Sequence, residues 1–133
     1  MNPIDLIGLP YRLGADPLKG YKAADCLTLS KAVLKYYGIK SPCPTRDWYR
    51  RLRKNDYSIF REQLELWGIK TERPKIGTVG LCKSSTGYGL AVYFENGWLN
   101  ITSYEGSAVT WSPEEALQVE EYYYPRKSNF VMS

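Results

Sequence analysis

The residue best suited to chemistry in this sequence is Cys26, which follows Asp25 at the start of an apolar pattern with helical spacing. The N-terminus of a helix favours the thiolate form, so cysteine nucleophiles are often found there. A cysteine hydrolase also needs a base that accepts the thiol proton and later protonates the leaving group. The 133 residues include no histidine. The sequence therefore offers a candidate nucleophile without the usual base.

The spacing around Cys26 also allows a purely structural interpretation. Cys26, Leu29 and Val33 fall on one face of the expected helix. A small thiol on such a face packs well between a helix and a sheet. Spacing alone favours this second interpretation, and both remain open at this stage.

The other two cysteines suggest neither a metal site nor a disulfide framework. Cys82 lies in a strand-like run and is expected to be a small buried residue. Cys43 lies between two prolines, in a loop that we expect to be exposed, and it could form an intermolecular disulfide outside a reducing cytoplasm. Their spacing matches no zinc pattern and the carboxylates do not cluster, so we expect no metal and no cofactor.

Composition indicates one globular domain that covers residues 1–133, with 44% hydrophobic and 24% charged residues. No apolar run approaches the roughly 20 residues that cross a bilayer. The first residues lack the charged and apolar segments of a secretory signal. We therefore expect no membrane partner and no standard leader.

The net charge of +4 is concentrated in one basic run, which comprises Arg46, Arg50, Arg51, Arg53 and Lys54. Arg46, Arg50 and Arg53 share a helix face and could contact phosphates. The solvated side of an amphipathic helix is the more common explanation of such a run. A nucleic-acid-binding domain usually has a larger basic excess, so we expect no nucleic-acid partner.

Local signals predict helices in the first half of the chain. Residues 1–24 are rich in glycine and proline and are expected to form an irregular arm. A helix should begin after an Asp25 N-cap and end at Gly38, with Ile39 making the usual hydrophobic contact. Two more helices are expected at 45–54 and 58–67, the latter with the same Gly-Ile ending at Gly68-Ile69.

After Pro74 the pattern changes from helical to alternating. Strands are expected at 78–83, 90–94, 98–102, 108–111 and 122–125. Asn96-Gly97 predicts a type I′ hairpin turn. Ser112-Pro113-Glu114-Glu115 predicts a capping box and a short helix. Helices followed by an antiparallel sheet predict an α+β fold.

Three motifs carry a family resemblance, namely Leu9-Pro10-Tyr11-Arg12-Leu13-Gly14, Asp25-Cys26-Leu27 and Tyr37-Gly38-Ile39. They resemble the N-terminal half of the NlpC-type cell-wall cysteine peptidases, most closely the single-domain forms of phage tail gene clusters. The resemblance implies a papain-like domain in which N-terminal helices pack on a C-terminal antiparallel sheet. It also implies that Cys26 is the remnant of the nucleophile.

The resemblance continues through Gly77–Leu81 and Leu90–Gly97, which look like the family's next two strands. It implies that Gly89 stands where the catalytic histidine should be, with Tyr88 beside it. Asn100 falls within one position of the third catalytic residue. Glycine cannot act as a base, and a phenol with an ordinary pKa of about 10 is a poor one at neutral pH.

The resemblance, with its missing histidine, leads us to expect a catalytically inactive domain used as a structural or binding part of a bacteriophage tail or baseplate. Other virion proteins would be its partners, and assembly in the host cytoplasm would explain the missing leader. Two alternatives remain. Cys26 could still cut peptidoglycan with Tyr88, a carboxylate or a partner's histidine as base. The groove could instead bind peptidoglycan without cleavage, through Tyr11, Tyr88 and Trp98.

Overall fold

The computed structural model describes residues 2–42, 45–84, 87–102 and 106–131. Within these ranges the α-helices are α1 (Cys26–Tyr36), α2 (Arg46–Arg53) and α3 (Ser58–Trp67). The strands are β1 (Gly68–Thr71), β2 (Val79–Ser84), β3 (Gly87–Phe94), β4 (Gly97–Asn100), β5 (Thr110–Pro113) and β6 (Val119–Pro125). Short 3-10 turns are η1 (Pro3–Leu6), η2 (Pro17–Lys19), η3 (Glu114–Ala116) and η4 (Lys127–Asn129). The fold is α+β, as the sequence predicts.

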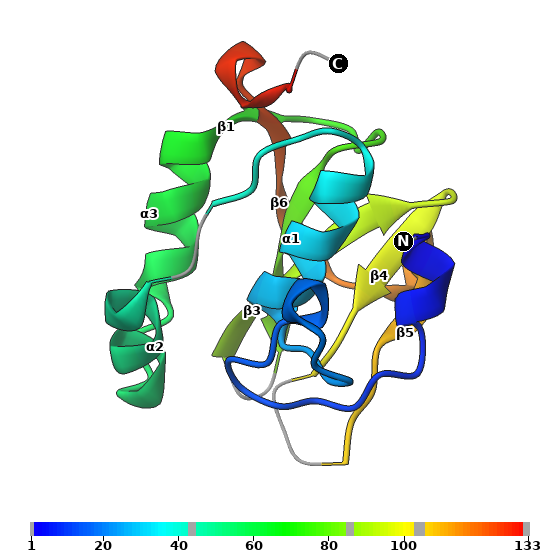
Figure 1. The fold of residues 1–133 in the computed structure, drawn as a ribbon. Coiled ribbons are helices and arrows are strands. Elements are labelled where there is room, and N and C mark those ends of the chain that lie inside the picture. Colours follow the sequence, from blue (N-terminus) through cyan, green and yellow to red (C-terminus); the bar gives the residue numbers. More distant parts are fainter. Residues whose placement is uncertain (1, 43–44, 85–86, 103–105, 132–133) are drawn as a thin grey trace.

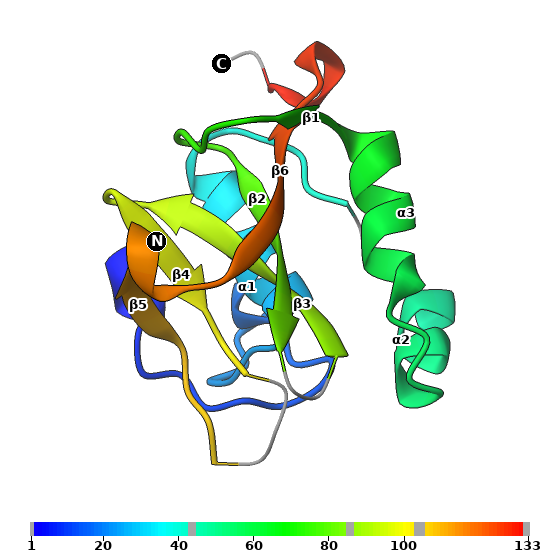
Figure 2. The same cartoon turned by 180° about the vertical axis from the view of Figure 1, so that it is seen from behind.

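The strands described form one antiparallel sheet in the order β1-β6-β2-β3-β4-β5. Helix α1 packs against β3 and β4, and α3 packs against β1, β3 and β6. Figure 1 shows α1 in front of the sheet with α3 beside it. Seen from behind in Figure 2, the sheet lies in front of α1. The helices thus cover one face of the sheet.

Strand β3 separates two apolar clusters. Leu90, Val92 and Phe94 belong to the main core under the helices. Ala91 and Tyr93 pack with Trp98 on the opposite face of the sheet. This division follows from the alternation of side chains along a strand. It fixes which β3 residues can reach α1.

The ends of α1 agree with the predicted caps. The Asp25 carboxylate accepts hydrogen bonds from the backbone N–H groups of Leu27 and Thr28, and the Thr28 hydroxyl accepts one from the Asp25 N–H. At the other end Gly38 has φ +72°, and the N–H of Ile39 donates to the carbonyl of Leu34. Both signals are local, and both predictions are confirmed.

The predicted left-handed ending of α3 at Gly68 is wrong. Gly68 has φ −136° and ψ −178°, so the chain passes directly from α3 into β1. A Cβ atom at Gly68 would lie 2.7 Å from the carbonyl oxygen of Tyr124. Glycine is needed here because β6 approaches closely, not because the backbone turns.

The hairpin turn between β3 and β4 lies one residue earlier than predicted. Glu95 and Asn96 have φ of +50° and +58°, and Phe94 pairs with Gly97. Gly97 therefore begins β4. A Cβ atom at Gly97 would lie 2.6 Å from the Trp111 ring. The close approach of β5 explains this glycine.

The predicted capping box at Ser112 is also wrong. Ser112 lies in β5 opposite Trp98, and its hydroxyl accepts a hydrogen bond from the Asn100 side chain. Only the 3-10 turn η3 follows, without a side-chain cap. Pairing with β4 holds this segment in extended structure.

Within the described part of the chain, no helix is long and apolar enough to cross a membrane.

Over its described residues, 2–24, the arm is irregular apart from η1 and η2. The side chains of Asn2 and Asp16 cap these two turns. Isolated bridges join Pro10 to Ala108 and Tyr11 to Ala24. The arm is therefore fastened to the segment before β5 and to the entry of α1, and this places Tyr11 beside Cys26.

Candidate functional site

A small cavity of about 160 Å³ lies at the N-terminus of α1. Its lining residues are Tyr11, Leu13, Asp25, Cys26, Leu27, Leu52, Arg53, Tyr57, Phe60 and Tyr88. We call this cavity the Cys26 pocket. The arm, α1, α2, α3 and β3 all contribute to it. It brings together three of the residues singled out from the sequence, namely Cys26, Tyr11 and Tyr88.

Cys26 is a buried thiol with only 7% of its surface exposed. Burial raises the thiol pKa from 9.0 to about 12, and the negative charge of Asp25 contributes in the same direction. A hydrogen bond from the Leu90 backbone lowers the pKa but offsets only part of the rise. Desolvation thus outweighs the helix N-terminus. Cys26 therefore stays protonated at neutral pH.

Both carboxylate oxygens of Asp25 accept hydrogen bonds from neighbouring segments. One oxygen accepts from the N–H groups of Leu27 and Thr28, at 2.9 and 2.8 Å. The other accepts from the Gly14 N–H at 2.8 Å and from the Tyr49 hydroxyl at 2.9 Å. These bonds use the lone pairs that a general base would need. Asp25 joins the arm, α1 and α2.

Tyr88, not Gly89, is the β3 residue that lines the Cys26 pocket. Gly89 pairs directly with Cys82, which packs on the Trp98 side of the sheet. Residues directly opposite on paired strands share a face. The position that the resemblance assigns to the lost histidine therefore faces away from Cys26.

Asn100 also lies on the face opposite Cys26. Its amide donates to the Trp98 carbonyl at 3.1 Å and to the Ser112 hydroxyl at 3.0 Å. Gly89 and Asn100 line a separate hollow of about 70 Å³ next to Cys82. The sheet separates both residues from Cys26. The three positions expected to be catalytic do not form one site.

Of the three residues expected to bind peptidoglycan, Tyr11 and Tyr88 line the Cys26 pocket, whereas Trp98 lies on the other face of the sheet. Burial, with the nearby charge of Asp25, raises the pKa of Tyr11 to about 12. The Arg61 guanidinium lies 5.8 Å from the centre of the Tyr88 ring. Trp98 is 1% exposed and stacks on Tyr122, with ring centres 5.9 Å apart. Trp98 is thus a core residue and cannot line the pocket.

The pocket residues that were not anticipated from the sequence include Arg53 and Tyr57. Arg53 was noted only as part of the basic run, and no local pattern distinguishes Tyr57. Both reach the pocket because α2 and α3 fold back against the arm. The amphipathic pattern of α2 is a signal for Arg53, but it does not say what the helix packs against.

The remaining cysteines lie outside this pocket. Cys82 is half-buried, and burial raises its pKa to about 12. Cys43, the candidate for an intermolecular disulfide, lies outside the described residues. Among the described residues no group of three or more Cys, Asp or Glu side chains is placed to hold a metal ion.

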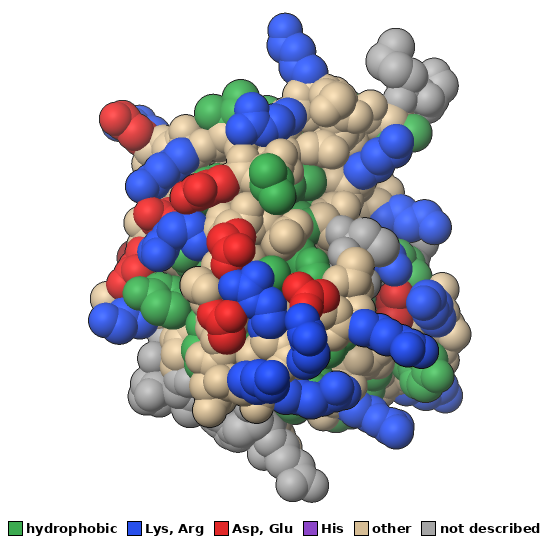
Figure 3. All heavy atoms as spheres, turned by 90° about the vertical axis from the view of Figure 1, so that its left-hand side faces the viewer, with side chains coloured by type: hydrophobic (Ala, Val, Ile, Leu, Met, Phe, Trp, Pro, Cys, Tyr) green, Lys and Arg blue, Asp and Glu red, His purple; other side chains and the backbone are tan. Residues whose placement is uncertain are grey.

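The basic run divides between structural and exposed side chains. Arg51 makes ion pairs with Asp56 and Glu62, at 2.7 and 2.5 Å, and Arg50 pairs with Asp47. Arg46 and Arg53 are exposed. In Figure 3, Lys and Arg side chains gather along the lower part of the face that holds α2. The run is the solvated side of a helix.

The sequence matches no known protein-family model, and no curated protein shows significant sequence similarity to it.

Proposed function

We propose that this chain is a non-catalytic, NlpC-like domain that serves as a structural or binding component of a bacteriophage tail or baseplate. The observation that carries the proposal is the state of Cys26. The thiol is buried and its pKa is raised to about 12, in a chain that has no histidine. Nucleophilic catalysis by cysteine needs a thiolate, and this environment disfavours it.

The NlpC-like part of the proposal is supported by the arrangement around α1. The Asp25-Cys26 pair opens a helix that packs on an antiparallel sheet, and Pro10-Tyr11 lies in the arm beside it. This is the arrangement that the motif resemblance implies. The papain-like fold remains part of the proposal, together with the phage setting.

No other base is available for Cys26 in the described part of the chain. Asp25 is engaged by four hydrogen bonds. The hydroxyl groups in the pocket are phenols, and the pKa of Tyr11 is raised to about 12. A phenol that is protonated at neutral pH cannot accept the thiol proton efficiently. Peptidoglycan cleavage is therefore disfavoured.

Peptidoglycan binding in the Cys26 pocket is disfavoured by size. The cavity of about 160 Å³ is smaller than the roughly 300–1,000 Å³ of typical ligand sites. By contrast, the domain exposes several large apolar side chains, including Tyr36, Leu66, Ile69, Ile76 and Val131. The proposal assigns these side chains to contacts with neighbouring subunits, where their burial would remove apolar area from water.

The first test is the alkylation rate of Cys26 by iodoacetamide between pH 5 and 9, read by mass spectrometry. A Cys43→Ser/Cys82→Ser background isolates this thiol, and the urea-unfolded chain supplies the reference rate. We expect the folded chain to react about 100-fold more slowly than the unfolded one, with no transition up to pH 9. A transition below pH 7, or release of peptide fragments from purified peptidoglycan, would restore the hydrolase hypothesis.

The tail assignment needs its own test. Mass spectrometry of purified phage particles that encode this chain should detect it at a fixed ratio to other tail proteins. Absence from the particles would contradict a structural role in the tail and leave the non-catalytic assignment intact.

A further inference from the structure

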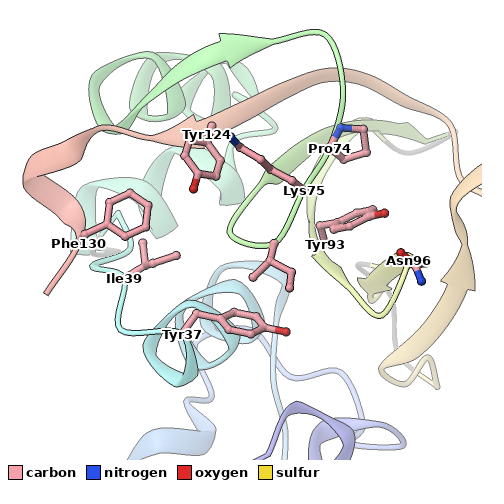
Figure 4. A pocket seen from close by; sticks show the side chains of 9 residues that line it. Tyr37, Ile39, Pro74, Lys75, Tyr93, Asn96, Tyr124 and Phe130 are labelled. Carbon is pink, nitrogen blue, oxygen red and sulfur yellow. The ribbon is translucent and has the colours of Figure 1, made fainter. Parts of the chain in front are cut away.

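Two hollows meet at the C-terminal end of α1, at the opposite end of the helix from Cys26. The first has a volume of about 660 Å³ and the second about 520 Å³. Ile39 lines both. We call the two hollows together the Ile39 surface. Figure 4 shows the first one and the side chains from separate elements that line it.

The Ile39 surface is rich in apolar and aromatic side chains, of which Ile39 and Tyr93 are buried and others are exposed to water. The first hollow is lined by Tyr37 from the C-cap of α1, Tyr93 from β3, Tyr124 from β6 and Phe130 from the segment after η4. Ile76 in the first hollow is 56% exposed and Val131 in the second is 53% exposed. Covering such groups is favourable because it removes apolar area from water.

The charged lining of the Ile39 surface is entirely positive. Its charged residues are Lys31, Lys35, Lys40 and Lys75, and no Asp or Glu lines either hollow in the described part of the chain. Lys31 pairs with Asp16 at 2.8 Å, and the Lys75 ammonium lies 4.1 Å from the centre of the Tyr124 ring. No ion pair involves Lys35 or Lys40 among the described residues.

Negative charges lie beside both hollows: Asp16 pairs with Lys31 of the second, and two glutamates lie on the hairpin side of the first. Glu114 accepts a hydrogen bond from the Tyr93 hydroxyl at 3.2 Å. Burial raises the pKa of Tyr37, and the charge of Glu95 contributes to that rise. Positive charge is thus concentrated beside the second hollow, where Lys35 and Lys40 flank an apolar floor.

We propose that the Ile39 surface docks an acidic segment of a partner protein. Aliphatic or aromatic side chains of that segment enter the hollows, and its carboxylates meet Lys35 and Lys40. Charge complementarity selects an acidic partner, since like charges are costly at an interface. A bilayer is a poorer fit, because interfacial membrane binding typically uses one amphipathic helix, whereas this surface is built from loops, strands and the end of a helix.

This docking surface does not depend on the non-catalytic assignment of Cys26. It lies at the far end of α1 from the Cys26 pocket and shares no lining residue with it. Reactivity of Cys26 would overturn the non-catalytic assignment without affecting the docking surface. Failure of docking would likewise leave the chemistry of Cys26 unchanged.

The test is selection of random linear peptides by mRNA display on the immobilised full chain, followed by fluorescence anisotropy of the enriched peptides. Sequences that combine Asp or Glu with Leu, Phe or Trp are expected. Lys35→Glu/Lys40→Glu should weaken their binding about tenfold or more. The matched control Lys22→Glu/Lys54→Glu makes the same change in net charge at exposed lysines outside both hollows, and it should change binding by less than about twofold.

A second variant separates the apolar contribution from charge. Val131→Ser replaces the two exposed methyl groups of Val131 in the second hollow with a hydroxyl. It should weaken binding of the same peptides about threefold or more. No enriched peptide, enrichment without acidic residues, or equal weakening by the two lysine variants would overturn the proposal. So would binding to phosphatidylglycerol vesicles that depends on Lys35 and Lys40 while no peptide binds, because that outcome would assign the surface to a membrane.

Discussion

The Tyr49 hydroxyl donates a hydrogen bond to Oδ2 of Asp25 over 2.9 Å, and this bond joins α2 to the N-terminus of α1. The same oxygen accepts the Gly14 N–H of the arm. Asp25 also contributes to the raised pKa of Cys26. The residue that anchors three segments thus also helps to keep the neighbouring thiol protonated.

Loss of this bond should reduce stability. Tyr49→Phe is expected to lower the free energy of unfolding by about 1 kcal/mol, because one buried hydrogen bond is lost. Asp25→Ala removes the helix cap as well and should cost about 2–4 kcal/mol. Urea unfolding measures both. The control Tyr36→Phe, at an exposed residue, should stay within about 0.5 kcal/mol. Equal effects of the two tyrosine variants would show that the bond to Asp25 contributes nothing.

The side of the sheet on which a β3 residue lies determines whether that residue can change the reactivity of Cys26. Tyr88→His would place an imidazole in the Cys26 pocket, whereas Gly89→His would place one on the opposite face. A nearby imidazolium stabilises a thiolate. Alkylation of Cys26 at neutral pH should therefore rise about tenfold or more in Tyr88→His and stay unchanged in Gly89→His. The reverse result would support the family resemblance, which places the lost histidine at Gly89.

The elements that the sequence predicts well are those with local signals. Helix α1 begins and ends where its caps predict, because the Asp25 side chain and the positive φ of Gly38 act within a few residues. The bounds of α3 at Ser58 and Trp67 are also as predicted. These signals need no knowledge of the tertiary fold.

The features that were missed depend on contacts between distant segments. Gly68 and Gly97 are set by the approach of β6 and β5, which no local pattern reveals. The burial of Trp98 and the face of Gly89 follow from which side of the sheet α1 covers. Motif spacing can predict that Gly89 lies in a strand, but not the face on which it lies.

Substitutions at Gly97 and Gly89 test the pairing of β4 with β5. In Gly97→Ala the new methyl group would overlap the Trp111 ring and the Ser112 carbonyl, and we expect a loss of about 2 kcal/mol or more in the free energy of unfolding. Gly89→Ala is the matched control, because its Cβ meets nothing within 4 Å. It should be neutral within about 0.5 kcal/mol. Comparable losses at both positions in urea unfolding would contradict the pairing of β4 with β5.

We expect the protein to lose stability in acid as Glu121 becomes protonated. Burial alone would raise its pKa, but hydrogen bonds from Lys70, Arg61 and Tyr123 lower it from 4.5 to about 2. A lowered pKa adds stability that is present above about pH 4.5 and is lost as the pH falls toward about 2.

Glu121→Gln should therefore cost about 1–3 kcal/mol at pH 7 and almost nothing near pH 2. Urea unfolding across this pH range gives the difference, with Glu120→Gln at an exposed neighbour as the control. A difference that does not change with pH would mean that Glu121 contributes by packing alone. Because its carboxylate accepts from Arg61 of α3 and Lys70 of β1, a pH-dependent difference would show that this charge holds α3 and the β1 edge against β6.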